Sequence, residues 1–422
     1  MLCLIEFLDN TYQRKLRILS QGRSEQYEDV IEQYKNMFLA HLNYAKGECK
    51  QKKCIYSSAC KVMKDEISKI EEDEIKEFFD KLKKIYLLWI DSSSIEAITT
   101  FNSLLKDYNL LTFKLEIKNY DVFFKGRISN DYLTKWDMFH IPFNKRHLIE
   151  NQRYSLTGQP IVYIGKSVID IVEELGTEEF EKLKISTVQL PIDMSIYDLR
   201  NSILDDLFKI FFDLLFGNQE TTRYNRNCFF KMILSSVCSF PKRQDLKKYS
   251  FCEEYVLPQL LAQILKNENF HGIMYQSTKK FENTSFEEKK ESFDFSDNSS
   301  FRENVALFTN INNNHVYDKE LFEKINISVP ININQVDRIT YKDLESIKDE
   351  INDIQKAEIL KNKNSIGQEK ITKADSIVSS FNRIYNKMKY KDKYYCDTII
   401  GQLHLYHLYE VLHQILTSEK EG

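Results

Sequence analysis

A pair of cations follows the first apolar stretch in the middle of the chain. The segment Asp121-Val122-Phe123-Phe124 has the aromatic and β-branched residues of a strand, and Lys125-Gly126-Arg127 comes directly after it. Glycine lets a backbone approach a ligand closely, while Lys125 and Arg127 can make charge-assisted hydrogen bonds to an anion. The pattern suits a pyrophosphate. On its own it is weak, because strand ends are often basic simply where they face water.

Two adjacent carboxylates lie on a short helix that follows the next strand. The apolar run Ile161–Ile164 predicts a buried strand, after which Ser167 is placed to cap a helix that Gly176 closes. At about 100° per residue, Glu174 lies beside the apolar face of this helix and Glu173 points further into solvent. We therefore expect Glu174 to reach a cleft between helix and sheet. The alternative is that both are ordinary solvated helix acids.

Further polar groups are candidates for contacts with a substrate. Arg153 and Tyr154 precede the strand that carries Tyr163, and Ser277 stands at the end of a later β-like run. A lone serine at a strand end is usually a turn residue, so Ser277 is a candidate only when it is taken together with the other segments. His140 stands between two apolar residues, which favours a core histidine with local hydrogen bonds over a substrate contact.

Taken in order, these segments resemble the RES (Arg-Glu-Ser) family of NAD+-degrading toxins. The matching pieces are Phe124-Lys125-Gly126-Arg127, Arg153-Tyr154 with Gly158 and Pro160, Tyr163, Glu174, and Gly272–Ser277. Two further segments, Phe139–Phe143 and Pro258–Leu261, are similar to one branch of the family in particular. One position departs from the pattern. Many members have Arg where this chain has Lys125, which replaces a bidentate contact by a point charge.

The resemblance implies a fold related to ADP-ribosyltransferases and cleavage of NAD+ at the bond between nicotinamide and ribose. It assigns Glu174 to the positive charge that develops on the ribose in an oxocarbenium-like transition state. It assigns the pyrophosphate to Arg127, with Lys125 and Arg153 behind it. The nicotinamide end is assigned to a tyrosine and a serine: Tyr163 would stack on or orient the ribose, and Ser277 would bond the amide or a phosphate. Tyr154 and His140 complete the candidate substrate contacts.

The acceptor in this reaction stays open. Water would make the chain a glycohydrolase and inorganic phosphate, as co-substrate, a phosphorylase; neither requires a metal or a further cofactor. A transferase that modifies a protein with ADP-ribose or phosphoribose, or a module that senses a nucleotide without turnover, are the alternatives. A HEPN-type ribonuclease is disfavoured, because Arg383 is followed by no histidine until His404.

Hydrophobic periodicity predicts an α+β protein in which a mixed sheet with helices, of the ADP-ribosyltransferase-like kind, is flanked by helical regions. We expect a helical domain over residues 1–115, a catalytic domain over 116–312 with a helical insertion near 198–250, and a mostly helical region over 313–422. Helices are expected over residues 27–45, 65–90, 95–105, 168–175, 200–216, 255–266, 340–361, 373–390 and 397–416. Strands are expected over 121–124, 161–164, 185–190, 272–275, 304–308 and, more weakly, 325–329, with a long loop over 281–302 and a linker over 362–370.

The composition excludes some classes of protein. The 59 basic and 63 acidic residues give a formal net charge of −4, which gives no support to nucleic-acid binding. No apolar run reaches the roughly 18 residues of a membrane span, and the first residues lack a signal peptide's basic start, so we expect a cytoplasmic protein. Cys49, Cys54 and Cys60 are read as free thiols, with zinc as the alternative. A toxin must be restrained in its host, so we expect an antitoxin or regulatory partner, and a homo-oligomer is possible.

Overall fold

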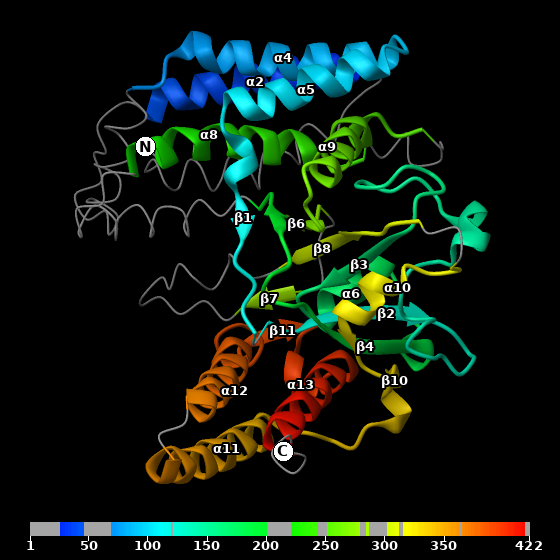
Figure 1. Cartoon of the computed structure of the whole chain (residues 1–422), viewed down its shortest axis with the longest axis vertical. Coiled ribbons are helices and arrows are strands. Elements are labelled where there is room, and N and C mark those ends of the chain that lie inside the picture. The colour runs from blue at the N-terminus through cyan, green and yellow to red at the C-terminus, as the bar shows by residue number, and fades with distance from the viewer. Residues whose placement is uncertain are drawn as a thin grey trace. The chain divides into compact units, whose positions relative to one another are not determined.

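The computed structural model describes residues 26–45, 69–119, 121–200, 221–242, 251–278, 284–286, 302–311, 315–362 and 365–417. The chain forms two compact units (Figure 1), each assembled from segments far apart in the sequence. Unit 1 comprises Met1–Leu115, Arg146–Gln159 and Ser195–Thr278, and unit 2 comprises Glu116–Lys145, Pro160–Met194 and Lys279–Gly422. Each unit thus combines three separate segments, whereas the sequence predicted domains made of consecutive residues. The candidate residues are divided between them.

Unit 1 is mainly helical. Its described helices are α2 (Tyr27–Ala45), α4 (Glu72–Ile90), α5 (Ser94–Asp107), α8 (Thr221–Cys238) and α9 (Val256–Asn267). Its strands are β1 (Lys114–Leu115), β5 (Ile196–Asp198) and β6 (Gly272–Gln276). Strand β5 pairs antiparallel with β1 and parallel with β6. Edge-to-face aromatic contacts, such as Tyr34 with Phe79 at 5.8 Å between ring centroids, fill the helical core.

The helices expected in unit 1 are largely confirmed. Helix α2 has the predicted bounds, and α5 and α9 begin and end within two residues of prediction. Helix α4 begins at Glu72, later than expected, where three successive acids favour a helix N-terminus. The helix expected over residues 200–216, apart from its first residue, and Cys49, Cys54 and Cys60 lie outside the described residues.

Unit 2 is built on an antiparallel sheet with the strand order β8-β3-β2-β4-β10. These strands are β8 (Glu303–Phe308), β3 (Ile161–Gly165), β2 (Phe123–Ile128), β4 (Leu183–Gln189) and β10 (Ile331–Asn332), and β9 (Asn326–Ile327) also pairs with β4. A smaller sheet joins β7 (Thr284–Phe286), β11 (Met388–Tyr390) and β12 (Lys393–Tyr394). Sheets with packed helices confirm the α+β class.

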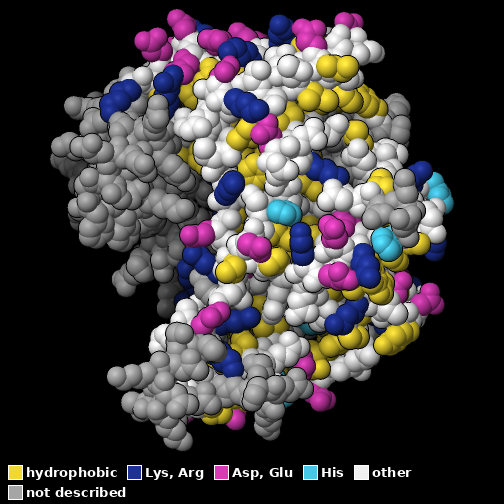
Figure 2. Space-filling view, in the orientation of Figure 1, with side chains coloured by type: hydrophobic (Ala, Val, Ile, Leu, Met, Phe, Trp, Pro, Cys, Tyr) yellow, Lys and Arg dark blue, Asp and Glu magenta, His cyan; other side chains and the backbone are white. Residues whose placement is uncertain are grey.

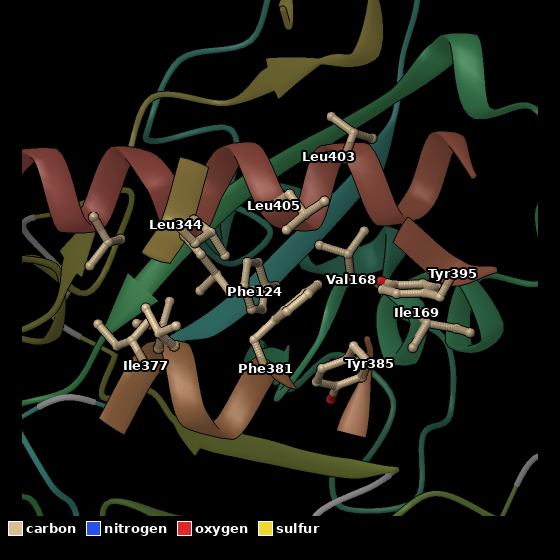
Figure 3. Packing of buried hydrophobic residues seen from close by; sticks show 14 of the residues in the cluster. Phe124, Val168, Ile169, Leu344, Ile377, Phe381, Tyr385, Tyr395, Leu403 and Leu405 are labelled. Atoms are coloured by element: carbon tan, nitrogen blue, oxygen red, sulfur yellow. The ribbon is translucent and has the colours of Figure 1, made fainter. Parts of the chain in front are cut away.

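The C-terminal helices form part of the core of unit 2. The helices of this unit are α6 (Val168–Leu175), α10 (Lys319–Lys324), α11 (Tyr341–Asn362), α12 (Ser365–Ile384) and α13 (Ile399–Thr417). One apolar cluster joins β2, β4 and α6 to α11, α12 and α13. Figure 3 draws Phe124 of β2 and Phe381 of α12 within this cluster, and their rings lie 4.8 Å and 5.1 Å from that of His404 on α13. The last third of the chain is therefore built into the sheet domain.

Several expectations for unit 2 are corrected. The expected linker over 362–370 contains the start of α12 at Ser365, and the expected helix over 373–390 ends at Ile384. Residues 388–390 form β11 instead, because they pair with β7, which lies within the expected loop over 281–302. Of the weak strand expected over 325–329, only β9 (Asn326–Ile327) forms, and β10 follows after Pro330, which has no N–H to donate to a ladder.

Short 3-10 helices complete the described elements, at Leu110–Thr112, Phe143–Leu148, Phe180–Lys182, Glu253–Tyr255, Ile333–Gln335 and Tyr395–Asp397. None of the helices in the described part of the chain is long and apolar enough to cross a membrane.

Candidate active site

Strand β2 presents its two cations on one face of the sheet. The pairing with β4 is regular from Phe123 to Ile128, so successive side chains alternate between faces. Phe124 belongs to the core that α6 covers, and a Cβ added to Gly126 would overlap Ile171 of that helix. Lys125 and Arg127 therefore leave the sheet on the face opposite α6. The sequence placed these two cations beyond the end of the strand, but both lie within β2.

The two cations have different surroundings. The Lys125 amine donates a hydrogen bond of 3.2 Å to the carbonyl oxygen of Tyr163 on β3. Burial, followed by the nearby charge of Arg127, lowers the pKa of Lys125 to about 8. Arg127 is exposed, and its Nη1 donates to the carbonyl oxygen of Asp137 at 2.7 Å. Opposite Lys125 on β4 lies the buried Ser186, whose hydroxyl has no partner among the described atoms.

His140 is held by the backbone through both ring nitrogens. The Asp318 N–H donates to Nε2 at 2.9 Å, so Nε2 must be the acceptor nitrogen. The carbonyl oxygen of Ile141 lies 2.7 Å from Nδ1, so Nδ1 must carry the proton. Burial, the largest effect, lowers the pKa of His140, which fits this neutral form. The substrate contact suggested for His140 is corrected to a structural role, because neither nitrogen is left for a ligand.

Helix α6 has the bounds and caps that the sequence predicted. Ser167 Oγ accepts from the backbone N–H of Asp170 at 3.1 Å, and Gly176 ends the helix in the left-handed conformation with φ 62°. Glu174 is half-buried, and its Oε1 accepts a hydrogen bond of 2.9 Å from Asn304 Nδ2. The helix therefore delivers the expected carboxylate to the sheet, at the first residues of β8.

Tyr163 shares a face of the sheet with this carboxylate. It pairs with Ala306, and Gly165, two residues further on β3, pairs with Asn304. Residues two apart on a strand lie on the same face, so Tyr163 and Asn304 are on the side that α6 covers. Glu174 and Tyr163 are thus brought to one side of the sheet. Arg127 is on the other, so the expectation that Arg127 and Glu174 flank one cleft is not met by the register of β2.

Two buried carboxylic acids accompany Glu174, and sequence reasoning missed both. Asp170 lies one turn before Glu174 and is fully buried, and Glu303 begins β8. Burial, followed by the charges of Glu303 and Glu174, raises the pKa of Asp170 to about 8, against the effect of a hydrogen bond from Ser167 Oγ at 2.8 Å. Asp170 therefore carries a proton at neutral pH. The only sequence signal was its place three residues after Ser167, which reads as an ordinary capping position.

The remaining candidates come together in unit 1. Arg153 donates from Nη1 to the carbonyl oxygen of Cys238 at 2.9 Å and from Nη2 to Thr278 Oγ1 at 3.2 Å. Since Thr278 follows Ser277, this guanidinium lies at the end of β6 that carries Ser277. Tyr154, next along the chain from Arg153, is buried with its ring 4.5 Å from that of Tyr275.

The surroundings of Arg153 suit an anion. Its guanidinium lies 4.9 Å from the centre of the Tyr255 ring, and no carboxylate pairs with it among the residues that the structure describes. Its loop is held in place by Gln259 of α9, whose Nε2 donates to the carbonyl oxygens of Gln152 and Ser155 at 2.8 and 3.1 Å. A partly buried cation bonded only to neutral acceptors can accept a phosphate without losing an ion pair.

Other chemistry finds less support in the described part of the chain. No group of three or more His, Cys, Asp or Glu residues there is arranged to hold a metal ion. On the face drawn in Figure 2, Lys and Arg side chains are interspersed with Asp and Glu, without a large area of one sign. This mixture agrees with the balanced composition of the chain.

Comparison with known proteins relates part of the chain to one protein whose name describes it as a putative toxin. It is 36% identical over 180 residues to a protein of Bacillus subtilis (strain 168) named "Putative toxin YopC", an alignment that covers 41% of this chain and 39% of that protein. The chain thus spans well under half the length of this relative. No family model matches the sequence. No solved structure matches it either, so the ADP-ribosyltransferase-like fold remains a prediction.

Proposed function

We propose that this chain degrades NAD+ by cleaving the bond between nicotinamide and ribose, and that it acts as a growth-arresting toxin or an anti-phage defence effector. The similarity to a protein named as a toxin supports the biological role. The ordered resemblance to RES proteins supports the chemistry. The observation that carries the proposal is the half-buried carboxylate of Glu174, held by Asn304 on the sheet face that Tyr163 shares.

The reaction needs little more than a placed carboxylate. When the N-glycosidic bond breaks, its electron pair leaves with nicotinamide and positive charge develops on the ribose. The carboxylate of Glu174 would stabilise that charge, which is greatest in the transition state. Water would then attack the anomeric carbon and lose a proton to give ADP-ribose. Inorganic phosphate would instead give ADP-ribose 1″-phosphate, the product of a phosphorylase.

The cations and Ser277 are proposed as substrate-binding groups. Arg153 with Ser277 at the end of β6 suits a phosphate, because its guanidinium has only neutral partners among the described residues. Lys125 and Arg127 also offer positive charge, but on the sheet face opposite α6. Arg153→Ala and Arg127→Ala test these two assignments separately, through KM for NAD+.

The deciding experiment measures nicotinamide release from NAD+ by the purified full chain, with and without inorganic phosphate. We expect release by the wild type and its loss, by 100-fold or more (about 2.7 kcal/mol of transition-state stabilisation), in Glu174→Ala. The matched control is Glu173→Ala, the neighbouring acid of the same helix, which should keep the wild-type rate. Wild-type release by Glu174→Ala would remove the catalytic assignment, and no release by the wild type would remove the activity.

The same samples separate the alternatives. A glycohydrolase or phosphorylase leaves a free small-molecule product, whereas a transferase leaves a mass increment on a protein. Tight NAD+ binding without release of nicotinamide would indicate a sensing module. In cells, expression of the wild type should arrest growth and deplete NAD+, and a neutralising partner protein, which a toxin requires, should restore both.

A further inference from the structure

We propose that Asn304 is the positioning residue of Glu174, fixing the orientation of the catalytic carboxylate, and that Gly165 keeps the space in which Asn304 does so. The inference rests on the proposed function, since it assigns a role in that reaction. The inference goes beyond the proposed function because it assigns roles to Asn304 and Gly165, to which the family resemblance assigns none.

The geometry places Asn304 between the sheet and the helix. Asn304 is 3% exposed, and its Nδ2 lies 2.9 Å from Glu174 Oε1. It pairs with Gly165 across the ladder of β3 and β8. A Cβ at position 165 would lie 3.0 Å from Asn304 Oδ1 and 3.1 Å from Asp170 Cβ, which is tighter than ordinary contact. A larger residue at position 165 would therefore press on the side chains of Asn304 and Asp170, which would have to move by a few tenths of an ångström.

The hydrogen bond also fixes which way the amide of Asn304 points. An ionised carboxylate can only accept, so the NH2 group must face Glu174 and the carbonyl oxygen must face away. That carbonyl oxygen is buried and has no partner among the described atoms. A buried acceptor without a bond costs free energy. The cost is offset by what the other end of the amide does for Glu174.

A neutral donor suits this place better than a charged one. The charges of Glu303 and Glu174 both raise the pKa of the buried Asp170, which is protonated at neutral pH. A lysine or arginine at position 304 would form an ion pair and neutralise the charge that the ribose cation needs. An aspartate would repel it. Asparagine orients Glu174 without adding a charge of its own beside the carboxylate.

The test uses Asn304→Asp, which keeps the shape of the side chain and replaces the donor by a second carboxylate. A like charge within hydrogen-bond distance raises the pKa of Glu174. We expect the acidic limb of the kcat profile for nicotinamide release to move up by about one pH unit. We also expect kcat at pH 7 to fall by 10-fold or more, with KM within about threefold of wild type. Asn304→Ser should lower kcat without moving the limb.

The matched control is Asn326→Asp, an exposed asparagine on β9 of the same sheet, which should keep the wild-type profile. A merely structural role for Asn304 would lower the melting temperature and the active fraction but leave the pH limb in place. An acidic limb that does not move in Asn304→Asp would overturn the proposal, and so would a wild-type kcat in both Asn304→Asp and Asn304→Ser. Either result would leave the NAD+-cleaving activity in place. Absence of nicotinamide release by the wild type would instead remove the proposed function, and this inference with it.

Discussion

The amine of Lys125 and the carbonyl oxygen of Tyr163 are joined by a hydrogen bond of 3.2 Å that crosses from β2 to β3. This lysine is partly buried, and burial first, then Arg127, lowers its pKa to about 8 from an ordinary value of 10.5. A lysine with such a pKa is charged and uncharged in comparable amounts near physiological pH. Its titration must therefore be visible in the stability of the protein.

We predict that stability rises with pH above about pH 8 because of Lys125. Between about pH 8 and 10.5 the unfolded chain holds the lysine proton and the folded chain has lost it, so the free energy of unfolding increases with pH. In Lys125→Met this rise disappears. Urea unfolding at pH 7.5, 8.5 and 9.5 measures it, with Lys184→Met, opposite Arg127 on β4, as the control. Parallel pH curves for wild type and Lys125→Met would contradict the assignment.

The opposite slope is predicted for Asp170. Its pKa of about 8 lies above its ordinary value of 3.8, so between these values the folded chain holds a proton that the unfolded chain has lost. Stability from this group is fully present below about pH 4 and declines as pH rises to 8. Asp170→Asn keeps the shape and the bond from Ser167. Its melting temperature should match that of the wild type at acid pH and exceed it at pH 8.

The control for Asp170 is Asp131→Asn, an exposed acid in a loop, which should not change the slope. If Asp170→Asn were less stable than the wild type at pH 8, Asp170 would be ionised in the folded protein. The electrostatic argument for a neutral partner of Glu174 would then need revision.

The short helix and its acid could be predicted because their determinants are local. Ser167 and Gly176 fix the ends of α6 through side-chain capping and a left-handed turn, and the period of the helix then places Glu174 beside the apolar face. Each of these signals lies within ten residues. The structure reproduces the helix residue for residue.

The partners of these residues could not be predicted, because they depend on register between distant segments. Asn304 meets Glu174 from 130 positions along the chain, and only the pairing of β3 with β8 brings it there. The register of β2 likewise decides whether Arg127 lies on the sheet face that α6 covers or on the opposite face. A shift of one residue in this register would move Arg127 to the other face. The sequence also held no sign that α13 packs on Phe124.

A structural role for His140 makes a prediction that separates stability from turnover. His140→Leu removes the acceptor of the buried Asp318 N–H and the donor to Ile141, which should lower the free energy of unfolding by about 1–3 kcal/mol. Nicotinamide release per folded molecule should be unchanged. The exposed His147→Leu serves as control and should affect neither quantity. A variant as stable as wild type but slow in turnover would restore the substrate contact.

The close packing of β2 against α6 gives the last prediction, for Gly126→Ala. The added Cβ would overlap Ile171 Cγ2 and lie 3.2 Å from Leu175 Cδ1, so the helix must shift outward, at a cost of about 1–3 kcal/mol in the free energy of unfolding. Because α6 carries Glu174, nicotinamide release should fall as well.

Ile171→Ala removes the atom that the new methyl group meets. The double variant should therefore lose less stability than the sum of the two single variants, by about 1 kcal/mol in urea unfolding. Ile169→Ala is the matched control. It is also buried in α6 but is not among the nearest neighbours of Gly126, so its effect should add to that of Gly126→Ala. Additivity with Ile171 as well would mean that the helix does not rest on this glycine, and the face assigned to Arg127 would have to be reconsidered.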